Sequence, residues 1–243
     1  KWVVYEKNTG KIAGFIRLGS PTINSKPRNE FLGKPLDTLD AKVMKRFNDS
    51  AIMGFIIVPT QPFGYNFLGG KLIATMVNSK VVRDEWEKTY GQKLVGFSTT
   101  SLYGIHSMYN GIPHWRGLGE SAGKIGLKPD DEFYDKWHDW IKKNRVDEYE
   151  SKIKSKGGKS GPVTGIKQRI LSIIFNEIGI SQSKYQHGFK RGVFFSEIYD
   201  NTRPFLRGEI KEDELVLKKR LDNDVESIVS WWQKKSLKRY HKL

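Results

Sequence analysis

The stretch from Met53 to Val77 reads MGFIIVPTQPFGYNFLGGKLIATMV and decides the fold. An apolar run ends at a proline, a loop containing Gly64 follows, and a second apolar run begins at Gly69 and Gly70, which predicts a strand, a loop and a helix. Such a connection aims free backbone N–H groups and the positive end of a helix dipole at one point. That point suits a phosphate; alternatively, the glycines serve only the backbone shape of a tight turn.

Further elements flank this stretch on both sides. Residues 2–6 and 11–18 predict a β-hairpin around Gly10, and residues 93–100 predict the strand that comes next after two helices. A strand, helices and a strand in this order imply parallel neighbours, or strands that start side by side and then splay apart. We also expect a loop at 20–37, helices at 39–47, 69–78, 79–90, 130–156, 164–178 and 222–243, an irregular aromatic segment at 102–126 and a strand at 192–199.

The order of elements predicts an α/β fold with a mixed sheet. We expect residues 1–128 to form this α/β core and residues 129–243 to form a helical, basic C-terminal portion that completes it. Residues 156–162, with their glycines and lysines, are typical of a flexible linker.

The composition favours a phosphate-rich partner. The 243 residues include 42 Lys and Arg against 27 Asp and Glu, a formal net charge of +15. Residues 151–243 hold 20 of the basic and 10 of the acidic side chains, so the excess is concentrated there. Such a balance gives nucleic acid a large, salt-sensitive attraction, although many proteins are basic only for solubility.

Other function classes are excluded or disfavoured. The absence of cysteine excludes disulfides, thiolate metal sites and a cysteine nucleophile. His106 and His114 are eight residues apart, and Asp135 with His138 forms one helical pair, so no set of three or four metal ligands emerges and we expect no metal. No apolar stretch approaches the roughly 20 residues of a membrane span, and we expect a cytoplasmic protein.

The order of a hairpin, a strand, a glycine-bearing loop, a Gly-Gly helix and a further strand resembles the core of GNAT-type N-acyltransferases over residues 1–101. In that family the loop binds the pyrophosphate of acyl-coenzyme A, so the resemblance implies acetyl-CoA or another acyl-CoA as cofactor. Gln61 and Gly64 match the family's pattern, whereas Asn66 stands where the family has Gly or Ala. The implied cofactor-binding residues are Val58, Gln61, Gly64, Asn66, Gly69, Gly70 and Lys71.

Candidate catalytic groups follow the strand at 93–100. An N-acyltransferase needs a dry groove for the thioester, a base or water chain for the amine proton, and an acid for the departing thiol. Hydroxyl and imidazole groups suffice for these roles, and Tyr103 is close enough in sequence to be the acid. The candidates are Thr99, Thr100, Ser101, Tyr103 and His106, each of which, taken alone, is also compatible with a structural or surface role.

A second resemblance is more specific and covers most of the chain. The order of motifs is similar to that of the DruA-type family. That family takes its name from a component of the bacterial anti-phage defence system Druantia, and its relatives also occur beside mobile elements. Thr99 and Thr100 stand where that family commonly has Glu-Thr, so no catalytic carboxylate carries over. The matching features are the strand 52–59 that ends in proline, the helix start 66–72, Trp86 with Tyr90 and Gly91, the strand 93–100, the aromatic segment 109–119 and residues 191–195.

Basic residues interleaved with aromatic ones predict contact with nucleic acid. Basic side chains neutralise phosphate, and aromatic rings stack on exposed bases, which suits single strands or distorted duplex. A solvated helix face and a flexible tail are the alternative, and we expect Trp231 and Trp232 to pack in the core. The candidate contacts are Lys154, Lys156, Lys159, Lys190, Arg191, Lys235, Lys238 and Arg239.

These observations combine into one leading hypothesis. The chain is a DruA-like protein with a GNAT-like acyltransferase core that acts on or near nucleic acid, modifying a base or an amine. The alternative is a non-catalytic DNA- or RNA-binding component of a defence or mobile-element system, and a third possibility is a structural or virion-associated protein. Nucleic acid and proteins of a defence or phage system are the expected partners, and no membrane is expected.

Overall fold

A computed structural model describes residues 1–33, 36–64, 66–104, 106–121, 129–154, 164–181, 184, 189–219 and 224–242. The chain forms two compact units, one made of residues 1–121 with 191–243 and one made of residues 122–190. The division expected at residue 128 stays a prediction about domain organisation. The boundaries between the two compact units fall after residues 121 and 190.

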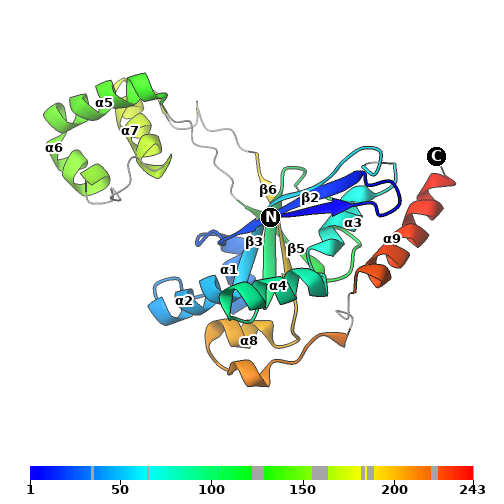
Figure 1. The fold of residues 1–243 in the computed structure, drawn as a ribbon. Coiled ribbons are helices and arrows are strands. Elements are labelled where there is room, and N and C mark those ends of the chain that lie inside the picture. The colour runs from blue at the N-terminus through cyan, green and yellow to red at the C-terminus, as the bar shows by residue number, and fades with distance from the viewer. Residues whose placement is uncertain are drawn as a thin grey trace. The chain divides into compact units, whose positions relative to one another are not determined.

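The first unit is built on a mixed sheet of six strands in the order β1-β2-β3-β4-β6-β5 (Figure 1). β3 and β4 are parallel, and every other neighbouring pair is antiparallel. The expected α/β class with a mixed sheet is therefore confirmed. The strands are β1 (Trp2–Tyr5), β2 (Ile12–Gly19), β3 (Ala51–Pro59), β4 (Gly96–Ser101), β5 (Trp115–Ser121) and β6 (Arg191–Glu197).

Helices cover both faces of this sheet. Phe195 of β6 packs on Phe31 of α1, whereas Ser196 donates a hydrogen bond to Asn78, just after α3. Because successive side chains of a strand point to opposite faces, α1 and α3 lie on opposite sides of the sheet. The helices of this unit are α1 (Lys26–Gly33), α2 (Ala41–Ser50), α3 (Gly69–Met76), α4 (Lys80–Tyr90), α8 (Thr202–Arg207) and α9 (Val225–Tyr240).

The apolar strands predicted from the sequence form the core between these layers. Ile52 on β3 and Phe97 on β4 are fully buried, as is Ile73 on α3. Adjacent parallel strands that are covered on both faces read as continuous apolar runs, and residues 51–54 of β3 are all buried, whereas Phe55 and Ile56 further along the strand are exposed.

The second unit has a small core of its own. α5 (Asp131–Asn144) packs on α7 (Thr164–Glu177), and between them lie α6 (Val146–Glu148) and a π-helical turn (Tyr149–Ile153). Isoleucines at helical spacing supply the buried side chains. These are Ile141, Ile153, Ile166, Ile170 and Ile173.

Most predicted boundaries are confirmed within a few residues. Ser79 caps α4 by accepting a hydrogen bond from the N–H of Val82, and Gly91 ends α4 with a φ of 67°. A left-handed residue at this place is the usual helix stop, and glycine adopts it without strain. The hairpin, the strands at β3, β4 and β6, and the helices at α2, α3, α4, α7 and α9 were all expected.

Three segment predictions are wrong. The expected loop at 20–37 contains α1, in which Pro27 is the second residue, a place where a helix needs no N–H from proline. The irregular segment at 102–126 contains β5, whose register shifts after Gly117 and whose outer side chains are exposed. The helix expected over residues 130–156 is interrupted at Arg145: α5 ends at Asn144, α6 and the π-helical turn continue to Ile153, and residues 155 and 156 lie outside the described residues.

Candidate functional site

The parallel strands β3 and β4 separate part-way along their length. Their pairing begins at Ala51 with Gly96 and ends at Gly54 with Thr99. β3 nevertheless continues to Pro59, paired only with β2 on its other side. We call the point where the two strands part, at Gly54 and Thr99, the β3–β4 fork. Beyond it, the edge of β3 that faced β4 has no pairing with β4.

A buried polar pair occupies this fork. The Thr99 hydroxyl donates a hydrogen bond to the Gly54 carbonyl oxygen at 2.9 Å. Thr99 is also hydrogen-bonded to the phenol of Tyr109, and this bond offsets part of the rise in the Tyr109 pKa that burial causes. The Tyr109 ring is 4% exposed and packs on Trp115 and Phe194. Burial raises the pKa of Tyr109 to about 12, so its phenol is neutral at pH 7.

The other catalytic candidates lie around this pair in different environments. Ser101 is buried on the same sheet face as Thr99, and it accepts a hydrogen bond from the N–H of Tyr103 at 3.2 Å. Thr100 points to the opposite face because side chains alternate along β4. The side chain of Tyr103 is 81% exposed in a turn, and His106 is also exposed.

Tyr109 was not among the predicted catalytic residues. The sequence placed it in an irregular aromatic segment, and nothing in its spacing distinguishes it from Tyr103. Only the pairing of β4 with β6 and the packing on Phe194 and Trp115 reveal which of the two phenols reaches the fork.

The glycine loop closes tightly on itself. The N–H of Gly69 donates to the carbonyl oxygen of Gly64 at 2.9 Å. A Cβ atom at Gly69 would overlap the backbone carbonyl of Phe63, and one at Gly64 would lie 2.7 Å from the Gln61 side-chain nitrogen. The N–H of Gly69 is therefore committed to the loop, and glycine is needed there for backbone approach.

The remaining cofactor candidates surround the start of α3. The backbone of Gly70 lies close to Met108, whose sulfur would be 2.8 Å from a Cβ at this position. Lys71 donates to the carbonyl oxygens of Met108, at 3.2 Å, and Asn110, so it connects α3 to the segment that carries Tyr109. The three candidates not yet placed, Val58, Gln61 and Asn66, all have exposed side chains.

The predicted nucleic-acid contacts do not gather in one described place. Lys154 lies in the second unit and forms an ion pair with Glu150, which raises its pKa. Lys235 and Lys238 are exposed on α9, one turn apart, and Arg239 beside them is half-buried. Lys190 is exposed, Arg191 begins β6, and Lys156 and Lys159 lie outside the described residues.

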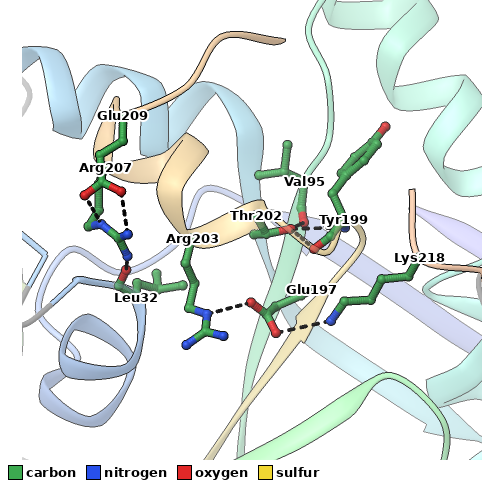
Figure 2. A network of polar contacts seen from close by, with 9 residues as sticks. All are labelled: Leu32, Val95, Glu197, Tyr199, Thr202, Arg203, Arg207, Glu209 and Lys218. Carbon is green, nitrogen blue, oxygen red and sulfur yellow. Dashed lines mark hydrogen bonds and ion pairs between the residues drawn. The ribbon is translucent and has the colours of Figure 1, made fainter. Parts of the chain in front are cut away.

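A network of polar side chains lies at the end of β6 (Figure 2). Glu197 accepts hydrogen bonds from Arg203 at 3.0 Å and from Lys218 at 3.2 Å, and its side chain is 11% exposed. The Thr202 hydroxyl donates a hydrogen bond to the Val95 carbonyl oxygen at 3.1 Å and accepts one from the backbone N–H of Tyr199. Each charge has a partner, so this network stabilises the turn from β6 into α8.

The described residues form neither a metal-binding cluster nor a membrane-spanning helix. No group of three or more His, Asp or Glu side chains in that part of the chain is arranged to hold a metal ion. None of the helices described there is long and apolar enough to cross a membrane.

Comparison with known proteins agrees with the more specific of the two resemblances. The family model described as Druantia protein DruA matches residues 1–208. The chain belongs to the DruA family. A curated relative, Druantia protein DruA of Escherichia coli (strain UMEA 4076-1), is 24% identical over 232 residues, which cover 88% of this chain and 54% of the relative. The chain therefore spans about half the length of that relative. No solved structure gives a significant match.

Proposed function

We propose that this member of the DruA family is a GNAT-like, acyl-CoA-dependent N-acyltransferase that acts on or near nucleic acid as a component of phage defence. The β3–β4 fork carries the proposal. The sheet has the arrangement that the GNAT resemblance implies. β1, β2 and β3 are antiparallel, β3 and β4 are a parallel pair that separates at Gly54 and Thr99, and β4, β6 and β5 are again antiparallel.

The unpaired edge of β3 suits the arm of a coenzyme. The pantetheine arm of acyl-CoA contains two amides, and such groups bind an open strand edge as an added strand would. Beyond Gly54 the edge continues for five residues, to Pro59. The diphosphate would then lie towards the glycine loop and the start of α3, where the helix dipole is positive.

Tyr109 supports the chemistry of the step. In acyl transfer, the amine nitrogen attacks the thioester carbonyl, a C–N bond forms, and the C–S bond breaks to release a thiolate. The thiolate then needs a proton, and the amine must lose one. Tyr109 keeps its phenolic proton at neutral pH and lies at the fork, so it is the proposed proton donor, with Thr99 as the positioning residue. The amine proton passes to water, and water returns a proton to the Tyr109 phenolate, so the phenol is restored after each transfer.

Acyl-coenzyme binding is the first measurement that tests this proposal. Acetyl-CoA is titrated calorimetrically into the purified chain, and a duplex and a single-stranded oligonucleotide are titrated in parallel at two salt concentrations. Saturable acetyl-CoA binding supports the acyltransferase. Its absence, together with salt-dependent binding of an oligonucleotide, overturns it in favour of a non-catalytic nucleic-acid-binding component of a defence or mobile-element system.

Two tyrosine variants test the role of the fork. Tyr109→Phe removes the proton donor and should lower thiol release from acetyl-CoA, measured with an oligonucleotide or polyamine acceptor, by about 10²-fold or more. Acetyl-CoA affinity should stay within about twofold. Tyr103→Phe is the matched control because that phenol is exposed, and it should behave as the unchanged chain does. Equal rates for both variants would remove Tyr109 from the mechanism.

A further inference from the structure

A groove of about 510 Å³ lies in the first unit, and Gly54, Thr99 and Tyr109 of the fork are not among the residues that line it. Its walls are the segment Gly111–His114, Thr75 on α3, and one side of α9 from Ser227 to Lys235. α9 is fixed beside α3 because the indole N–H of Trp232 donates to the Phe67 carbonyl oxygen at 2.8 Å. The groove thus lies between two packed helices and a short segment.

Positive charge collects at this groove. Lys235 is part of its wall, and Lys71 on the neighbouring α3 lies near enough that the two ammonium groups repel. Burial, with a smaller contribution from Lys235, lowers the pKa of Lys71. None of the described residues that form the wall is acidic, and neither lysine forms an ion pair with a carboxylate in that part of the chain. Two adjacent cations without a counter-charge suit an anion such as phosphate.

The groove also presents an aromatic ring. Trp231 faces it, and the Lys235 ammonium lies 5.3 Å from the centre of that ring. Trp231 packs against the core, as the sequence predicted, but its side chain is only partly buried, so part of the ring stays accessible at the groove. A ring beside a cation matches the two halves of a nucleotide, since the base stacks on the ring and the phosphate contacts the ammonium.

We propose that this groove binds one unpaired nucleotide of a single-stranded nucleic acid, its base against Trp231 and its phosphate against Lys235. The groove volume is within the range of small-ligand sites. Lys238, exposed one turn further along α9, continues the phosphate path beyond the groove. Nucleotide binding at the groove does not require acyl transfer at the fork. If both proposals hold, the groove would bind the nucleic acid on or near which the acyltransferase acts.

The test measures single-strand binding to the whole chain. The fluorescence anisotropy of a labelled oligo-dT of about 12 nucleotides, within the usual site sizes, is followed at several salt concentrations. Lys235→Gln should weaken binding and reduce the slope of log K against log salt by about 0.7, the loss of one phosphate contact. Lys234→Gln is the matched control because it removes the same charge from the neighbouring exposed position, which is not part of the groove wall. Its slope should not change.

The aromatic contact is tested separately. Trp231→Leu keeps apolar volume but removes the stacking surface, and it should weaken oligo-dT binding by about fivefold or more. The midpoint of thermal unfolding is recorded for each variant. If Trp231→Leu unfolds at a lower temperature, Lys235→Gln still tests the groove because Lys235 is exposed and its substitution should not affect folding. The proposal that the groove binds a nucleotide would be overturned if Lys234→Gln and Lys235→Gln changed oligo-dT binding equally. It would also be overturned if the unchanged chain did not bind oligo-dT.

Two competitors identify the source of the nucleotide. A free nucleoside monophosphate that displaces oligo-dT at equal concentration would overturn the assignment to a strand, whereas displacement only at large excess supports it. Acetyl-CoA binding should be the same in Trp231→Leu as in the unchanged chain. If it is lost while oligo-dT binding remains, the groove belongs to the coenzyme and the proposal fails, while the acyltransferase proposal stands.

Discussion

The β3–β4 fork and the groove beside α9 are both polar sites in the first unit, but their polar side chains differ in charge and in exposure. At the fork, Tyr109 and Thr99 are neutral, buried, and hydrogen-bonded to each other. In the groove, Lys235 is charged and exposed, and it rests over a partly exposed ring. The first arrangement suits proton donation in a dry place, and the second suits a salt-sensitive grip on phosphate.

The difference shows why one charge count misleads about this chain. A net charge of +15 describes the groove and says nothing about the fork, where no charged side chain takes part in the Thr99–Tyr109 pair. α3 joins the two places, because Lys71 in its first turn contacts the segment of Tyr109 and Thr75 one turn later forms part of the groove wall. Substitutions at Gly69, Tyr109 and Lys71, with Gly70→Ala as a control, test whether the fork and the groove differ in this way.

The largest effect is expected at the start of α3, the element that both places share. Gly69→Ala would place a Cβ into the Phe63 carbonyl, and backbone cannot move aside as a flexible side chain can. We expect a loss of more than about 3 kcal/mol in the free energy of unfolding, measured by urea denaturation. Coenzyme and strand binding should be lost together, since both places depend on α3.

Gly70→Ala is the control for that substitution. Its Cβ would meet the sulfur of Met108 at 2.8 Å, and this flexible side chain can turn away. We expect a change below about 1 kcal/mol, because alanine also favours the helix. A stable Gly70→Ala that no longer binds acetyl-CoA would show a phosphate cradle at α3. Equal destabilisation by the two substitutions would contradict the close approach at Gly69.

The second effect separates the fork from the groove by pH. The pKa of Tyr109 is about 12 in the folded chain against 10.0 for an ordinary tyrosine, so the folded state holds its proton more tightly. The stability this provides is complete below pH 10 and is lost as the pH rises towards 12. Two pKa units correspond to about 3 kcal/mol.

Tyr109→Phe has no proton to lose and should escape this alkaline loss. We expect it to be less stable than the unchanged chain at pH 8, by about 1 kcal/mol for the lost hydrogen bond, and more stable near pH 11.5. Urea denaturation of both proteins from pH 8 to 11.5 measures the crossover. Parallel curves across this range would mean that the phenol is not buried at the fork.

The sequence could predict the fold more fully than the site. The apolar runs of β3 and β4, the serine cap at Ser79 and the stop at Gly91 are local signals, and all four are confirmed. α1 escaped prediction because its buried face includes Arg28 and Asn29, so it lacks an apolar stripe. Local patterns find elements whose stability is visible in their own residues.

The site depends on contacts between distant residues. Tyr109 reaches Thr99 only because β6, about 90 residues further on, pairs with β4 and carries Phe194 to the same face. The groove likewise joins Thr75 to Lys235. The charge at Lys235 was visible in the sequence, but its place beside Trp231 and Lys71 was not. A tyrosine in an aromatic segment or a lysine on a basic helix carries no local mark of such a partner.

The smallest effect is expected at Lys71, which connects the two places. Its ammonium donates to the carbonyl oxygens of Met108 and Asn110 on either side of Tyr109, and it also repels Lys235. Lys71→Met keeps the apolar stem and removes both interactions. The lost hydrogen bonds destabilise the fold, whereas the relief of desolvation and repulsion stabilises it, so the net loss should be about 1 kcal/mol or less.

The consequences for the two places should differ in kind. At the groove, removing one of two cations should reduce the salt dependence of oligo-dT binding. At the fork, the segment that carries Tyr109 loses its hydrogen bonds to Lys71 on α3, so thiol release from acetyl-CoA should fall several-fold. The pKa of Tyr109 should not change. An unchanged salt slope would place Lys71 outside the groove's field, and an unchanged rate would show that the packing of Tyr109 on Trp115 and Phe194 is enough to hold the phenol at the fork.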